Sequence, residues 1–247
     1  MNRNGSVGLI IVLVIIGIVL IGLIIWFLLS DNSQSMYFTD PKEVALVNAA
    51  NKGDLKGAQA AVQAGADPNA LGIQSTTPLM AELATANKQG VSVLLSVGAN
   101  PNLPSTEGAL PIELAARAPD SDFLKMMLAS GGNPSAHGDV GKPLIWLAAV
   151  DDRWDNVQLL LDSGADINGT DVSGFTTVMA MAMLGRFDRA LWFINKGADV
   201  RIATLGGATL AKVISNAPPS APAQVSARQQ VIQLLAAKGI QVPSSTP

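Results

Sequence analysis

The sequence contains no cysteine and only one histidine, His137, among its 247 residues. Without thiols there is neither a disulfide framework nor a cysteine metal site, and a lone histidine is weak support for a catalytic base or a metal centre. Charged residues are also scarce, at 14% of the chain, and the net charge is −3. A chain with so little charge offers no basic face for nucleic acid. These absences direct the search away from cofactors, metals and nucleic acid.

One long apolar segment stands near the start of the chain. Residues 7–29, VGLIIVLVIIGIVLIGLIIWFLL, contain no charge, and at about 1.5 Å per helical residue they span the roughly 30 Å hydrocarbon core of a bilayer. A cleaved signal peptide has a shorter apolar core, of about 7 to 15 residues, followed by a cleavage site of small residues. We therefore predict an uncleaved transmembrane helix with Trp26 near one interface, followed by a polar linker over residues 31–40.

The charges that flank this segment are few. The α-amino group and Arg3 precede it, and Asp31 and Asp40 are the first charged residues after it. The positive-inside rule favours a cytoplasmic N-terminus, which predicts a single-pass protein of a bacterial inner membrane with its C-terminal domain in the periplasm. The reverse orientation, with a cytoplasm-facing domain, is the alternative. The glycines of the segment are not spaced as GxxxG, so we expect a monomer.

A glycine returns every 33 residues through the rest of the chain, in variants of the motif G-A-D-P-N. These glycines are Gly65, Gly98, Gly131, Gly164 and Gly197. Apolar residues precede each glycine by seven, four and three positions, as at Val157, Leu160 and Leu161, and this spacing forms one face of a helix. Glycine commonly ends a helix because it adopts the left-handed conformation at little cost. The pattern predicts a helix that stops at each glycine.

A second apolar segment begins 21 residues before each glycine and predicts a second helix in each unit. Several of these segments place proline in the first turn, where its missing N–H costs nothing. In the fourth unit the segment KPLIWLAAV begins one residue earlier, at Lys142. This offset predicts a one-residue shift that is absorbed between the two helices of that unit.

Units with a T-P-L-like opening, a pair of small residues, a V-x-x-L-L helix and a G-A-D-x-N turn resemble ankyrin repeats. The runs TTPLMA and WDNVQLLLDSGADIN carry the resemblance most closely. The resemblance implies an all-α solenoid of about six helix–turn–helix units behind the transmembrane helix. The predicted units are 41–73, 74–106, 107–139, 140–172, 173–205 and a degenerate 206–242, with an extended loop at the insertion 215–227 and a disordered tail at 243–247.

The sequence departs from the family at the histidine of the T-P-L-H opening, which in that family ties neighbouring turns together. Its place is taken by Val47, Met80, Glu113, Ile145 and Met179. We expect packing to substitute for the missing hydrogen bonds.

Other residues could suggest chemistry, and each has a simpler interpretation. His137, with Asp139 beside it, is predicted to be an exposed loop residue. The acidic stretch Asp151–Asp155 is predicted to cap helix starts rather than to bind a cation. Asn168 begins an N-G-T glycosylation motif but is also the turn residue of the family. We expect no catalytic, metal-binding or cofactor-binding residue.

The tryptophans of the repeats could form an aromatic binding patch. Trp192 falls at a predicted core position of its helix, and Trp154 begins such a helix, so both are predicted to lie in the core. Trp146, on the first helix of its unit, is left open between core and surface.

The resemblance implies that binding occurs through the loop tips and the exposed side of the first helices, on the concave surface. Candidate protein-binding residues share one register between turn and helix, or are apolar residues beside it. They are Ile73, Gln74, Thr106, Glu107, Asp139, Val140, Val150, Val172, Ser173, Phe175, Met183, Leu184 and Leu205. A contiguous apolar patch there would mark an interface, and the stretch from Val140 to Leu184 is the strongest part.

The sequence thus predicts a membrane-tethered scaffold or adaptor that binds a protein partner and has no enzymatic activity. Bacterial proteins that resemble this arrangement include ones proposed to protect against toxic effectors or oxidative stress, so the resemblance implies an immunity or protective role. A small-ligand or enzyme site around His137 is the less favoured alternative.

Overall fold

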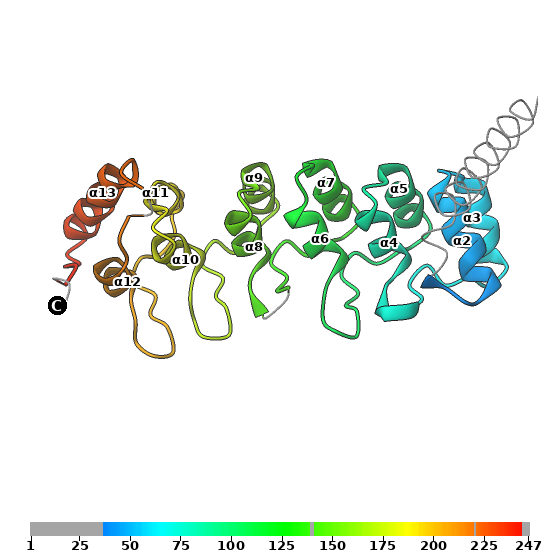
Figure 1. The fold of residues 1–247 in the computed structure, drawn as a ribbon, viewed down its shortest axis with the longest axis horizontal. Helices are drawn as coiled ribbons and strands as arrows, with labels where there is room; N and C mark the ends of the chain where they lie inside the picture. The colour runs from blue at the N-terminus through cyan, green and yellow to red at the C-terminus, as the bar shows by residue number, and fades with distance from the viewer. Residues whose placement is uncertain (1–36, 139–140, 220, 244–247) are drawn as a thin grey trace, which may run out of the picture.

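A computed structural model of the protein describes residues 37–138, 141–219 and 221–243. Twelve α-helices over these residues follow one another in six pairs along one long axis (Figure 1). The first helices of the pairs are α2 (Pro41–Asn51), α4 (Pro78–Ala84), α6 (Pro111–Arg117), α8 (Leu144–Val150), α10 (Thr177–Met183) and α12 (Leu210–Asn216). The second helices are α3 (Leu55–Gln63), α5 (Lys88–Ser96), α7 (Ser121–Ala129), α9 (Trp154–Asp162), α11 (Phe187–Asn195) and α13 (Gln224–Ala237).

The pairs stack so that like helices form rows. In Figure 1 the second helices α5, α7 and α9 lie in an upper row, the first helices α4, α6 and α8 lie below them, and long loops hang beneath. We call these loops between successive pairs the fingers, numbered one to five along the chain. They are residues 64–77, 97–110, 130–143, 163–176 and 196–209. The prediction of an all-α repeat is confirmed for the described residues.

The predicted transmembrane helix at 7–29 lies outside the described residues, together with linker residues 31–36, Asp139, Val140 and tail residues 244–247. Over the residues that the structure describes, no helix has both the length and the apolar character that a bilayer crossing requires.

The repeating glycines end the second helices, as the spacing predicts. Gly65 has a φ of +97° and the other four range from +85° to +100°. At the end of α3, the Gly65 N–H donates to the Val62 carbonyl at 2.9 Å and the Ala66 N–H donates to the Ala61 carbonyl at 2.9 Å. This pair of bonds satisfies carbonyls that the last helical turn leaves without partners.

Gly164→Ala is expected to lower the free energy of unfolding by about 1 kcal/mol, because a Cβ is unfavourable in the left-handed conformation. The φ is +90°, and a Cβ added at this position would meet no atom within 4 Å, so the effect is conformational and not steric. Urea denaturation measures this change in the free energy of unfolding. Gly206→Ala is the matched control, since Gly206 is not left-handed and an added Cβ would make only an ordinary contact with Thr204 Oγ1, at 3.9 Å. Equal effects of the two substitutions would contradict this account.

The helix register in the fourth unit differs from the prediction. Helix α8 begins at Leu144, which is 33 residues after Pro111 of α6 and 33 before Thr177 of α10. Pro143 occupies the N-cap position rather than the first helical turn, so α8 keeps the 33-residue spacing of the neighbouring first helices. The predicted one-residue shift is wrong, and Trp146 rather than Ile145 stands where the family has histidine. Trp146 is buried.

Hydrogen bonds from one finger to the next replace the ties that the missing histidines would make. The Asn69 carboxamide accepts from the Asn100 N–H at 2.7 Å and donates to the Gly98 carbonyl at 3.1 Å. Asn102 repeats both bonds one unit later. Ser135 and Asn168 each accept a backbone N–H from the following finger. The polar residue four positions after each glycine therefore joins neighbouring units, whereas packing alone was predicted.

Two further expectations need correction. Trp154 and Trp192 are half-buried rather than core residues, and their rings meet edge to face with centroids 5.5 Å apart. The buried aromatic residues of α11 are Phe187 and Phe193, the latter one position after Trp192. In the last unit the loop is shorter than the insertion 215–227, because α12 extends to Asn216 and α13 begins at Gln224.

Candidate interaction surface

An apolar hollow of about 280 Å³ lies where the fourth finger meets the first helices of the last two units. Phe175 enters it from the fourth finger, Met183 from the end of α10, and Val213 and Ala217 from α12 and its C-cap. Lys212 also lines it and has an exposed side chain. The hollow has space for one apolar side chain of a partner, and Lys212 is among its lining residues.

Exposed apolar side chains accompany this hollow. Met183 at its wall is 56% exposed, and Leu184 follows it at 44%. Val172 and Leu205, in the fourth and fifth fingers, are 73% and 85% exposed. Large apolar side chains at such exposure are candidates for an interface. We call Val172, Phe175, Met183, Leu184 and Leu205 the apolar patch.

Backbone contacts hold the finger tips against one another. The Leu205 N–H donates to the Ser173 carbonyl at 2.9 Å, which fixes the fifth finger to the fourth. A Cβ on Gly141 of the third finger would approach Cγ1 of Val172 to 2.6 Å, so those two tips also touch. Contacts between neighbouring fingers therefore fix the positions of Val172 and Leu205.

The other predicted binding residues lie in different parts of the structure. Ile73, Gln74, Thr106 and Glu107 are exposed in the first two fingers, far along the stack from the apolar patch (Figure 1). Ser75 and Thr106 are joined by a hydrogen bond between their hydroxyl groups. Val150 is half-buried at the end of α8. Asp139 and Val140, the candidates of the third finger, lie outside the described residues, so whether the candidates form one surface stays a prediction.

Sequence reasoning missed residues that the period itself could have indicated. Leu114 and Val213 occupy the same position in α6 and α12, where α4 and α10 have alanine. Leu114 is 39% exposed. It lines an apolar hollow of about 490 Å³ with Leu83 and Phe123. Leu71 in the first finger was also missed and is 50% exposed.

His137 is exposed, as predicted, and it makes a contact between fingers. Its Nε2 donates to the Thr170 carbonyl oxygen of the fourth finger at 3.1 Å. Among the described residues, no cluster of three or more histidine, aspartate or glutamate side chains is placed to hold a metal ion. The histidine that could suggest chemistry is thus a link between neighbouring fingers.

The acidic stretch Asp151–Asp155 does not cap helix α9, so the capping prediction is wrong. The N-cap residue is Arg153, and it makes no side-chain cap. Instead Asp151 forms an ion pair with Arg117 at 2.7 Å, and Asp152 forms one with Arg186 at 3.4 Å. The first bridges back to α6 and the second forward to the turn before α11, so the acidic residues connect adjacent units.

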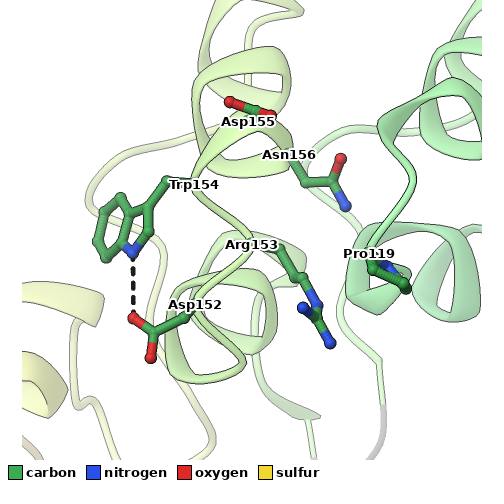
Figure 2. Close-up of a pocket in the computed structure, with 6 residues that line it drawn as sticks. All are labelled: Pro119, Asp152, Arg153, Trp154, Asp155 and Asn156. Carbon is green, nitrogen blue, oxygen red and sulfur yellow. Dashed lines mark hydrogen bonds between the residues drawn. The ribbon is translucent and has the colours of Figure 1, made fainter.

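A polar hollow of about 200 Å³ lies beside this stretch, between the third and fourth units. Figure 2 shows Pro119, Arg153 and Asn156 around it, with Trp154 donating from Nε1 to Asp152. The Nδ2 of Asn156 donates to the carbonyls of Ala116 and Ala118, each at 2.9 Å. Its role is to satisfy the C-terminal end of α6.

Lys88 connects the second and third units through two carboxylates, those of Asp120 and Asp122, each at 2.6 Å. Hydrogen bonds from Lys88 lower the pKa of both aspartates, and the bonds to Asp120 and Asp122 raise the pKa of Lys88. Because the carboxyl pKa is lowered on folding, this contribution to stability is present above the unfolded pKa and is lost as the pH falls through the folded value. The contact is therefore intact at neutral pH.

The fold of this chain is similar to that of a solved structure. The crystal structure of EF0377, an ankyrin repeat protein, aligns with a TM-score of 0.61 at 24% sequence identity, over 78% of this chain and 97% of that chain. The chain has an ankyrin-repeat fold. No protein-family model and no curated protein sequence matches it. The first helices and fingers of this fold carry the apolar patch described above.

Proposed function

We propose that the chain is a membrane-tethered interaction module that holds a protein partner on the apolar patch. The observation that carries this proposal is the hollow walled by Phe175 and Met183, with exposed Leu184 beside it. A water-exposed apolar hollow with an ammonium group at its rim suits a partner segment that inserts an apolar side chain and places an acceptor near Lys212. Burial of that side chain supplies the affinity, and Lys212 orients it.

The tether is the apolar run at residues 7–29, which has the length and composition of a membrane-spanning helix. The flanking charges favour placing the repeats on the periplasmic side of a bacterial inner membrane. A protective or immunity role, in which the repeats hold a harmful or vulnerable protein at the membrane, is consistent with this arrangement. No observation on the described residues favours an enzyme site at His137.

Met183→Glu is expected to abolish partner capture, because a carboxylate in the apolar hollow would be desolvated without a full set of hydrogen bonds. The test is co-purification with the full chain from membranes of the source cells, compared by mass spectrometry with the unchanged protein. Met183 is 56% exposed, so its replacement is expected to change the free energy of unfolding by no more than about 0.5 kcal/mol. The control is Asn195→Glu, an exposed charge at the end of α11 on the second helix of the same unit. Capture that survives Met183→Glu would remove this hollow from the binding site.

A further inference from the structure

The first finger is anchored to the segment through which the chain enters the repeats. Phe38 is buried, and its ring lies against Gly72 of that finger. A Cβ on Gly72 would overlap both the Phe38 ring and the Tyr37 carbonyl oxygen, so only glycine permits this approach. Tyr37 and Phe38, which lead into α2, thus pack against the first finger.

The short connection keeps this finger close to the predicted span. Tyr37 is eight residues after Leu29, the last residue of the apolar run, so the connection extends at most about 28 Å. Leu71 and Ile73, on the same finger, are 50% and 53% exposed. With Tyr37 they line a hollow of about 160 Å³. Two aliphatic side chains and a tyrosine are the residue types that enter a membrane interface.

The tip that carries these residues also has an unusual backbone. Gln74 and Ser75 both adopt positive φ, +56° and +59°, in a short 3₁₀ turn over Ile73–Ser75. The later fingers have glycine at the position of Ser75, as at Gly108, Gly174 and Gly207. Two non-glycine residues in the left-handed region store strain, and such strain concentrates at functional sites.

We propose that the tip of the first finger, through Leu71 and Ile73, rests in the interfacial region of the lipid bilayer and so orients the stack on the membrane. This inference rests on the proposed tether. Asp40 and Glu43 line the same hollow, so the contact is confined to the exposed side chains of Leu71 and Ile73, and anionic lipid is expected not to strengthen it. Helix α10, whose end carries Met183 of the apolar patch, lies toward the opposite end of the stack from this finger (Figure 1).

The absence of cysteine makes a direct test simple, since one introduced cysteine labels one site. The full chain carrying Ile73→Cys, labelled with an environment-sensitive fluorophore, is reconstituted into phosphatidylcholine vesicles containing nitroxide-labelled lipid. The control is Leu205→Cys, which has the same register in the last finger. We expect lipid quenching to be several-fold stronger at position 73 than at 205, and unchanged when phosphatidylglycerol is added.

Equal quenching at positions 73 and 205 would overturn the membrane contact. Vesicle flotation after carbonate extraction tests the tether separately. If the protein floats while position 73 is unquenched, the contact is wrong and the tether stands. If the protein is extracted, the tether itself is wrong. Thermal unfolding followed by circular dichroism shows that both labelled variants are folded.

Discussion

Phe193→Ala is expected to lower the free energy of unfolding by about 4 kcal/mol, since removal of a fully buried phenylalanine loses its transfer energy and leaves a cavity. Phe193 is 0% exposed and packs with Trp192 and Trp154, whose ring centroids are 5.1 and 6.0 Å away. Both neighbours meet it at angles that favour aromatic contacts. Chemical denaturation measures the change in stability.

The repeat architecture predicts where this loss falls. Each unit packs on its neighbours only, so stability is close to a sum of unit and interface contributions. Hydrogen exchange is expected to increase in α9 to α13 and to remain near its original rate in α3 and α5. Trp192→Ala, the half-exposed neighbour, serves as the control and should cost about 1 kcal/mol. A uniform increase in exchange over all helices would show that the stack unfolds as one unit.

Asn156→Ala is expected to lower the free energy of unfolding by about 3 kcal/mol, because it leaves buried carbonyls without a donor. The Asn156 side chain is 1% exposed, and its Nδ2 also lies 3.3 Å from the Ala115 carbonyl, in addition to those of Ala116 and Ala118. Among the described residues its Oδ1 has no hydrogen-bond partner, so the side chain acts here only as a donor to these carbonyls. Equilibrium denaturation in urea measures the change.

Asn156→Asp keeps the shape and removes the donors, so it separates hydrogen bonding from packing. It is expected to be more destabilising than Asn156→Ala, since a carboxylate would face carbonyl oxygens in a buried site. The control is Asp155→Asn on the exposed side of the same turn, with an expected change of about 0.5 kcal/mol. If Asn156→Ala cost no more than this control, the role assigned to the side chain would be wrong.

How far the sequence predicts the molecule depends on whether a contact is local or between units. The glycine stops follow from backbone conformation alone, and the structure has them at positive φ at all five positions. The position of α8 did not follow, because Pro143 resembles a first-turn proline and only the packing of α6, α8 and α10 shows that it lies at the N-cap. The local proline pattern places the start of this helix one residue too early. The packing of the helix against its neighbours decides where it begins.

The interaction surface was predictable in part for the same reason. Val172 and Met183 stand out as apolar residues at positions where a solvated loop or helix end needs none. The hollow beside Met183 also needs Val213 and Ala217, which belong to the divergent last unit, and no spacing rule brings these to Phe175. Asn156 was missed because its partners, the carbonyls of α6, are about forty residues away and belong to the backbone.

The most direct test of the central claim is site-specific photo-cross-linking in the source cells. The full chain carries a photoreactive residue either at Met183, in the apolar patch, or at Asn195, an exposed residue at the end of α11 on the second helix of the same unit. The account predicts that the Met183 position yields one discrete cross-linked protein and the Asn195 position does not. The same cross-linked species at both positions, or none at Met183 with a product at Asn195, would contradict the claim that the finger and first-helix face binds the partner.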